Sequence, residues 1–451
     1  MGLLGTLENT LEHALLGVQP HGPIDARAAF VGRPAPPFAV YVHVPFCGAL
    51  CSYCSFNKQR PHGEMDRYAD AVVREAALWA AEPAFAAPRA TSVFVGGGTP
   101  SFLPAGALER MIGGVIDRLG VRAGTQVSVE ANPESLDDEK LAAMKRAGVT
   151  RVSVGVQTFD EAQLRKLGRR HRLADIARAV GAAKDTFGEV SIDLMYGLPG
   201  QTMEAFQEDI ERAIALPIGH LSFFPVVYRP GTAMDRQHPE GHGADGGRER
   251  LWRMYDWGSR RLERAGFRAY TSEDYTRSGV ECHYQVDMWE PPVKGVLGLG
   301  AGAISGFNGW TWHGLGPVDA YLGAVEAGRL SIARGMRMSR RQRMVEHLLV
   351  GLHSLSVHPA RFAQESGVPL WALVGPAPRA LSALGLLDRR ADGAWVPTRR
   401  GRFAIAHAWT GFVLDQLSHA AEDTCAAADR PARAKPQRAS TRTAPSPSAS
   451  T

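Results

Sequence analysis

FAVYVHVPFCGALCSYC, residues 38–54, joins a strand-like segment to a group of cysteines. Its first part, Phe38–Val44, combines β-branched and aromatic residues as buried β-strands do. Directly afterwards, Cys47, Cys51 and Cys54 follow one another in a CxxxCxxC spacing. A loop with this spacing can bring three thiolates together at the end of a strand. The sequence therefore predicts a metal centre beside a sheet.

The number and spacing of the cysteines favour an iron–sulfur cluster over a disulfide framework. The chain has 5 cysteines, and Cys282 and Cys425 are distant from the triplet. Structural zinc sites and structural clusters usually have four protein ligands. Three ligands leave one iron of a [4Fe–4S] cluster open to an outside molecule. The alternatives are a zinc ion completed by His43 or His62, and three free thiols.

Strand-like and helix-like segments alternate from the cysteine region's strand to about residue 230. After Phe38–Val44, the expected strands are residues 92–95, 126–130, 151–156, 190–195 and 220–227. The expected helices are residues 68–82, 106–119, 137–147, 161–167, 173–186 and 202–216. Because parallel strands need a crossover, this alternation predicts an α/β fold with a parallel sheet. Six such strands fit a partial (β/α)6 barrel, whose active-site residues lie at the C-terminal strand ends.

Polar residues and glycines follow the expected strands where a ligand would bind. The VFVGGGTPS segment can bring its backbone close to a ligand, because glycine has no side chain to obstruct it. Each of the next three strands ends in a polar residue. The candidate ligand-binding residues are Gly97, Gly98 and Thr99 of the glycine segment, and Glu130, Gln157 and Asp193 at the strand ends. A single one is as often a cap or a surface residue, but the ordered set indicates a shared ligand.

Composition and pattern divide the chain into four parts. Residues 1–36 are a loosely patterned lead-in, and residues 37–331 hold the barrel with an extension that includes a Gly-rich strand region at 296–305. Residues 332–418 contain expected helices at 344–353, 359–365 and 377–384, then a hairpin at 385–397, an order that resembles a winged helix. We expect this unit to cover the barrel mouth and help shape the substrate pocket. Residues 419–451 are poor in apolar residues and predicted to be disordered.

Charge and hydropathy point to a protein of the cytoplasm. The formal net charge is +5, from 51 basic and 46 acidic residues. No basic stripe interleaved with aromatic residues is present, so no nucleic-acid partner is expected. Residues 1–20 lack an export signal, and no segment reaches the roughly 18 apolar residues that a membrane span needs.

The motifs YVHVPFCGALCSYCSFN, GGGTPS, VEANPES, VGVQTFD, LGRRH and IDLMYGLPGQT occur in this order. Together they resemble the HemN-like radical S-adenosylmethionine (SAM) family, which contains the oxygen-independent coproporphyrinogen dehydrogenases. The resemblance covers roughly residues 38–416, and VPTRRG (396–401) looks like the family's wing. It implies a radical SAM barrel with a [4Fe–4S] cluster on Cys47, Cys51 and Cys54, and SAM cleavage to a 5′-deoxyadenosyl radical. An external one-electron reductant, such as flavodoxin or ferredoxin, is implied as a partner.

The same resemblance assigns SAM contacts one residue at a time. A first group matches contacts with the SAM at the cluster, and Tyr53 matches an aromatic residue common between the second and third cysteines. A second group matches contacts with a second SAM, and two residues match adenine-side contacts. The contacts with the first SAM are Tyr41, Gly97, Gly98, Thr99 and Glu130. The contacts with the second SAM are Gln157, Arg169 and Asp193, and the adenine-side contacts are Val227 and Ile304.

Departures from the family pattern decide between its branches. The dehydrogenases resemble CxxxCxxCxC, but Phe56 replaces the last cysteine here. The haem chaperones carry HNxxYW, of which CHYQVDMW keeps only His283 and Trp289, one residue further apart. These features favour a C-methyltransferase or cyclopropanase branch that uses two SAM molecules on an aromatic, heterocyclic or tetrapyrrole small molecule. The alternatives are a haem chaperone and a coproporphyrinogen dehydrogenase-like oxidoreductase.

Overall fold

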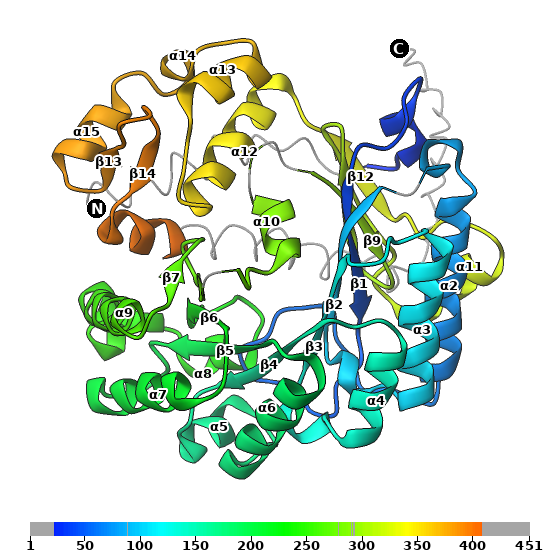
Figure 1. Ribbon diagram of the computed structural model, residues 1–451, viewed down its shortest axis with the longest axis horizontal. Helices are drawn as coiled ribbons and strands as arrows, with labels where there is room; N and C mark the ends of the chain where they lie inside the picture. The colour runs from blue at the N-terminus through cyan, green and yellow to red at the C-terminus, as the bar shows by residue number, and fades with distance from the viewer. Residues whose placement is uncertain (1–21, 88, 278, 290, 292–293, 408–451) are drawn as a thin grey trace, which may run out of the picture.

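One curved sheet of twelve strands organises the chain in the computed structural model, which describes residues 22–407 with gaps at 88, 278, 290 and 292–293 (Figure 1). The strand order is β12-β11-β10-β9-β1-β2-β3-β4-β5-β6-β8-β7. The strands are β1 (Phe38–Val44), β2 (Ala90–Gly97), β3 (Gln126–Ala131), β4 (Arg151–Gln157), β5 (Val190–Tyr196), β6 (His220–Pro225), β7 (Arg268–Ala269), β8 (Asp274–Thr276), β9 (Gly295–Leu299), β10 (Ile304–Phe307), β11 (Trp310–His313) and β12 (Arg334–Arg337).

The strands β1 to β6 pair consecutively and in parallel, which confirms the predicted barrel core. The sheet continues beyond it, because β9 joins β1 in parallel and β10–β12 follow antiparallel. At the other edge, β8 pairs antiparallel with β6. The strand region expected at 296–305 contains β9 and the start of β10. The chain turns between them at Gly300 and Gly302, whose φ values of +95° and +76° favour glycine.

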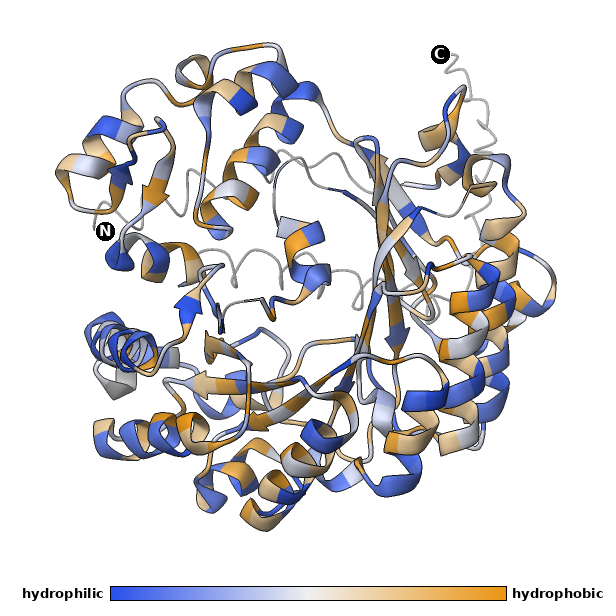
Figure 2. Ribbon diagram, in the orientation of Figure 1, coloured by the Kyte–Doolittle hydropathy of each residue, from blue (hydrophilic) through white to orange (hydrophobic). Residues whose placement is uncertain are grey.

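Helices cover the outer face of the sheet, as crossovers between parallel strands require. Along the barrel they are α2 (Met65–Ala80), α3 (Ala105–Arg118), α4 (Asp138–Arg146), α5 (Glu161–Leu167), α6 (Leu173–Phe187), α7 (Met203–Ala215), α9 (Gly247–Arg264) and α11 (Val318–Glu326). The short helix α8 (Ala233–Gln237) instead lies against the cysteine loop, where Met234 N donates to Ser52 O at 2.9 Å. Figure 2 shows hydrophobic and hydrophilic residues alternating along the outer helices α2 and α3. In contrast, α10 (His283–Trp289) lies within the curve of the sheet (Figure 1).

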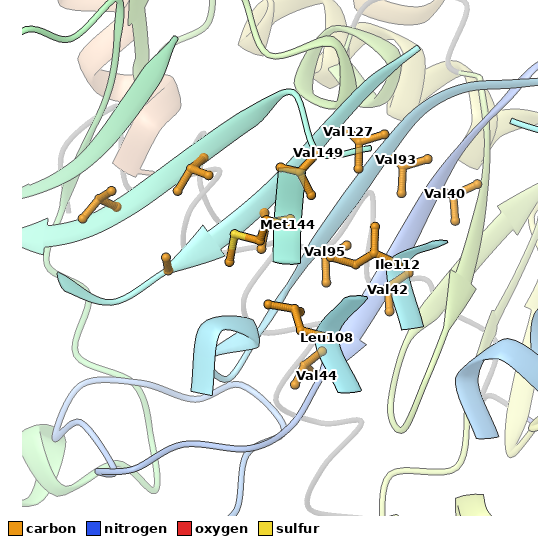
Figure 3. Close-up of a cluster of buried hydrophobic side chains, with 14 of the residues drawn as sticks. Val40, Val42, Val44, Val93, Val95, Leu108, Ile112, Val127, Met144 and Val149 are labelled. Carbon is orange, nitrogen blue, oxygen red and sulfur yellow. The ribbon is translucent and has the colours of Figure 1, made fainter. Parts of the chain in front are cut away.

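The core lies between the strands and the outer helices. Val40, Val42 and Val44 of β1 are almost fully buried, together with Leu108 and Ile112 of α3. Figure 3 shows these side chains gathered on one side of the sheet. Burying an aliphatic side chain of this size contributes about 1.5–3 kcal/mol. Because successive strand residues face opposite sides, the residues between these valines face the inside of the curve.

The lead-in is more ordered than its sequence pattern indicates. The 3-10 helix at Ala26–Phe30 buries Ala26, Ala29 and Phe30 in the main core. Phe30 packs edge-on against Phe85, with ring centroids 5.1 Å apart. Residues 1–21, Cys425 and the tail predicted at 419–451 lie outside the described residues. Within the described residues, no helix is long and apolar enough to cross a bilayer.

A second unit packs beside the barrel and matches the order expected of a winged helix. It contains α12 (Arg340–His353), α13 (Pro359–Ser366), α14 (Leu370–Val374), α15 (Ala377–Ala383), β13 (Leu387–Arg389) and β14 (Trp395–Pro397). Only the first two residues of VPTRRG lie in the hairpin, because residues 399–407 form a further helix. From that helix, Arg399 and Arg402 donate hydrogen bonds to Glu263 of α9 at 2.5 and 3.0 Å.

One buried carboxyl group makes the stability of the barrel depend on pH. Glu75 accepts hydrogen bonds from Gly300 N and Tyr321 Oη at 2.8 and 2.9 Å. Burial raises its pKa from 4.5 to about 7. A carboxyl whose pKa rises on folding contributes stability below its unfolded pKa, and that stability is lost as the pH rises through the folded pKa.

Glu75→Gln should therefore weaken the decline in stability between pH 5 and 7. The substitution removes a loss of unfolding free energy of about 3 kcal/mol, which the ionisation of Glu75 causes over that range. Urea unfolding midpoints of both proteins at several pH values would measure the difference. Identical pH slopes for the two proteins would contradict the role of Glu75.

Candidate functional site

The candidate site is a cavity of about 410 Å³ within the curve of the sheet. Its volume falls in the range of about 300–1,000 Å³ that small-molecule sites usually have. All three cysteines of the CxxxCxxC motif line it, together with inward-facing residues of β2 to β6. The C-terminal ends of the strands and the cysteine loop therefore line the same cavity, as expected for the active site of a partial barrel.

The cysteine loop is held by contacts with neighbouring strands and loops. Thr99 Oγ1 donates to Cys47 Sγ at 3.7 Å, and Arg169 Nη1 donates to Cys51 Sγ at 3.8 Å. Lys58 Nζ donates to the carbonyl of Cys54. Burial, with smaller contributions from Cys54 and Cys51, raises the pKa of Cys47 to about 11, although the hydrogen bond from Thr99 opposes it. Such thiols become thiolates when a metal centre binds them.

The residues around this loop fit a cluster better than a zinc ion. Both ring nitrogens of His43 already have partners, Tyr41 Oη at 3.1 Å and Asn57 O at 2.8 Å. His62 is exposed and does not line the cavity. Three thiols facing one cavity match the three protein ligands of an open [4Fe–4S] cluster.

The glycine segment brings its backbone up against the cysteine loop. Gly97 has a φ of +112°, and a Cβ there would lie 2.6 Å from the ring of His43. A Cβ on Gly98 would lie 2.8 Å from the carbonyl oxygen of Val44. Gly97 N donates to Glu130 Oε2 at 3.1 Å. No larger residue fits at either glycine, so the backbone itself lines the cavity.

Two carboxyl groups face the cavity with raised pKa values. Burial, and then the nearby Asp193, raise the pKa of Glu130 from 4.5 to about 8. Burial raises the pKa of Asp193 from 3.8 to about 6, although the hydrogen bond from Ser153 at 3.2 Å opposes it. Carboxyl groups with perturbed pKa values that line a cavity are candidates for a functional site.

Gln157 and Arg169 are distant in sequence from the cysteines, but both line the cysteine cavity. Arg169 Nη2 donates to Gly155 O at 2.6 Å and to Asn132 Oδ1 at 2.8 Å. Gln157 has a φ of +71°, a conformation that costs a non-glycine residue about 1–3 kcal/mol. Its buried Oε1 has no hydrogen-bond partner among the described residues. A buried acceptor without a protein partner, on a residue in a strained conformation, is available to accept a hydrogen bond from a ligand.

The remaining predicted contacts divide into two groups. Tyr53 and Val227 line the cavity, whereas Tyr41 and Ile304 do not. Tyr41 instead packs beside the stacked rings of Phe94 and Tyr284, with ring centroids 6.4 and 6.0 Å away. Ile304 begins β10, in the antiparallel extension of the sheet. Ile304 is therefore absent from the cavity lining, and its contact with adenine stays a prediction.

Several cavity residues had no signal in the sequence. Arg151 and His220 begin β4 and β6, so they reach the cavity from the opposite ends of their strands. His353 comes from α12 of the second unit, and its Nδ1 lies 2.8 Å from Ser272 Oγ. Burial lowers the pKa of His353 to about 3, so its ring is neutral at pH 7. The second unit thus helps shape the cavity, as we expected.

A second pocket, of about 460 Å³, lies beyond α10 and between the barrel and the second unit. His283 is exposed and lines this pocket instead of the cysteine cavity. Gln285 and Trp289 line both spaces, so α10 is the wall between them. The outer pocket is also lined by His347, His358 and Arg361.

Comparisons with known proteins agree with this geometry. The model of the radical SAM superfamily matches residues 41–213. The haem chaperone HemW of Mycobacterium tuberculosis is 33% identical over 82% of this chain and 93% of its own length, and HemW of Bacillus subtilis is 29% identical over 81% and 96%. The solved structure of Escherichia coli coproporphyrinogen III oxidase (HemN), a radical SAM enzyme, covers 88% of this chain and 98% of that one. Its TM-score is 0.72 at 23% sequence identity, which is a similarity of fold.

Proposed function

This chain belongs to the HemN-like radical SAM family, whose members carry a [4Fe–4S] cluster and bind SAM, and we propose that it is a haem-binding member of that family. The haem-chaperone relatives support the proposal, since they match over most of their length. The observation that carries it is the outer pocket, where His283 and Trp289 lie with two further histidines and an arginine.

The chain's own residues would divide the work in the cysteine cavity. Cys47, Cys51 and Cys54 would hold the cluster, and the backbone at Gly97 and Gly98 would receive the amino group of SAM. When bound, the cluster and SAM supply a 5′-deoxyadenosyl radical after one-electron reduction. Glu130 would accept hydrogen bonds from the ribose hydroxyls, whose donation favours its ionised form. Arg169 would fix the position of the loop that carries Cys51 relative to β4, because its guanidinium contacts both.

The outer pocket offers each kind of group that a haem requires. The exposed imidazole of His283 can ligate iron, which is a common role of a neutral histidine. The indole of Trp289 offers an apolar face to the macrocycle. Arg361 is exposed and can pair with a propionate, although Glu365 shares it at 3.2 Å. These groups come from α10 and α13, so the pocket exists only when the second unit packs on the barrel.

The sequence alone led us to prefer a C-methyltransferase, and the relatives do not support that preference. They are named haem chaperones, so they favour the alternative. The similarity to coproporphyrinogen III oxidase, at 23% identity, is evidence for the fold alone.

The purified full chain should bind haem through His283. Titration with haem is expected to give a Soret band that His283→Ala weakens at least about tenfold in affinity, since one axial ligand is lost. His62→Ala is the matched control, because His62 is exposed and lies outside the outer pocket. Equal haem affinity of the His283→Ala variant and the native chain would contradict the proposal.

Product analysis separates the haem-binding and methyltransferase functions. With cluster, SAM and reductant, a methyltransferase that uses two SAM molecules would release 5′-deoxyadenosine and S-adenosylhomocysteine in equal amounts. A haem-binding member without methyl transfer should release 5′-deoxyadenosine and no S-adenosylhomocysteine.

A further inference from the structure

A basic surface adjoins the loop that carries the three cysteines. Residues 165–172 have the sequence RKLGRRHR, which begins in the last turn of α5. Its cationic residues Arg165, Lys166, Arg170 and Arg172 are exposed, whereas Arg169 points inward to Cys51. We call these four exposed residues, with Leu50, the basic patch. In Figure 1, α5 lies at the lower edge of the molecule.

Direct contacts place this patch on the cysteine loop. Ser52 N donates to Leu167 O at 3.0 Å, and Ser52 Oγ donates to Lys166 O at 3.2 Å. A Cβ on Gly168 would lie 3.3 Å from the carbonyl oxygen of Leu50. The segment that carries the exposed cations therefore packs directly on the loop whose three thiols line the cavity.

Little local negative charge neutralises the patch. Glu161 pairs with Arg165 at 3.8 Å. Asp160 is engaged in capping α5, where its Oδ1 accepts from Ala162 N at 2.7 Å and Gln163 N at 3.2 Å. Lys166 and Arg170 form no ion pair with any described residue. Their positive charge is thus available to an acidic partner.

An apolar side chain completes the patch. Leu50, between Cys47 and Cys51, has 47% of its surface exposed and is one of five large apolar residues that are exposed in the described part of the chain. Transient interfaces between redox proteins are small and combine a few apolar contacts with complementary charge. One exposed apolar residue on the loop that holds the metal ligands, next to the segment that carries the cations, has this composition.

We propose that the basic patch is the docking surface for a small acidic protein that carries one low-potential electron. One electron leaves the reduced carrier, which is oxidised, and enters the centre held by the three cysteines, which is reduced. No bond forms or breaks, and no proton moves. The inference rests on the cluster of the proposed function and is independent of haem binding. The position of the patch on the cysteine loop favours an electron carrier over a nucleic acid or an anionic membrane.

The test is charge reversal at the two unpaired cations. The full chain with reconstituted cluster is compared with its Lys166→Glu/Arg170→Glu variant, and an acidic flavodoxin is the probe. We expect the variant to bind flavodoxin about tenfold more weakly at low ionic strength, and the salt dependence of its Kd to be flatter. The rate at which reduced flavodoxin bleaches the cluster absorbance should fall in parallel, whereas dithionite should reduce both proteins equally.

Arg118→Glu/Arg329→Glu is the matched control, because it makes the same change of net charge at exposed residues on other elements. An equal Kd for the two double variants would overturn the proposal. Slower reduction of the patch variant by dithionite would also overturn it, because Lys166 and Arg170 would then act on the centre itself. So would patch-dependent binding of an anionic vesicle or a single-stranded RNA without binding of flavodoxin.

Discussion

Cys51→Ala is expected to abolish both the iron–sulfur absorbance and the cleavage of SAM. The three cysteines are the available thiol ligands of the cavity loop, and a cubane held by two of them would leave two irons without protein ligands. The expected loss of 5′-deoxyadenosine formation is complete within detection. Iron and sulfide content, visible absorbance and chromatography of the SAM products would measure it.

Cys282→Ala provides the matched control for cluster assembly. Cys282 is buried and free, like Cys47, and it also lines the cavity, but it belongs to the segment that leads into α10 and not to the cysteine loop. The chain with this change should retain its full iron and sulfide content. If Cys51→Ala kept its cluster absorbance and its SAM cleavage, the assignment of the cysteine triplet would be refuted.

Arg169→Lys is expected to slow SAM cleavage by about 10- to 100-fold, equivalent to about 1.4–2.7 kcal/mol. The guanidinium of Arg169 reaches Gly155 O and Asn132 Oδ1 through Nη2 and Cys51 Sγ through Nη1. Lysine keeps the charge but cannot donate along these diverging directions from one planar group. Each hydrogen bond from a charged donor contributes about 1.5–3 kcal/mol, so the loss of one accounts for the effect.

Two measurements separate a positioning role of Arg169 from general damage to the fold. SAM affinity by equilibrium binding and the rate of 5′-deoxyadenosine formation with dithionite should both fall, while circular dichroism shows the variant still folded at the assay temperature. Arg170→Lys is the control, because Arg170 is the exposed neighbour and keeps its charge. Equal rates for Arg169→Lys and Arg170→Lys would refute the role of Arg169 in the site.

Much of the fold could be predicted because its signals are local. The apolar run at Phe38–Val44 forms the central strand β1 with the predicted bounds. Six strand-like segments separated by helical ones leave few arrangements other than a parallel sheet. That arrangement in turn brings the strand ends together, which is why Glu130, Gln157 and Asp193 line one cavity. For these residues, position along a strand was enough to predict position in space.

The cofactor could also be predicted from the sequence, since the chemistry of CxxxCxxC depends on spacing within one loop. The branch of the family could not be predicted in this way, because the residues that bear on it are far apart in the sequence. His283 looked like an incomplete motif in the sequence. The fold turns it away from the cysteine cavity and into a pocket with His347 and His358, which are more than sixty residues further along the chain.

The sequence by itself determined the barrel strands and the three candidate cluster ligands, because these depend on residues that are neighbours or follow a short period. The tertiary structure alone decided the two-sided wall of α10, the reach of His353 into the cavity and the absence of Ile304 from its lining. The physical reason is that these features depend on packing between segments far apart in the chain. Such packing is set by the shape of the complete core, and no local pattern encodes it.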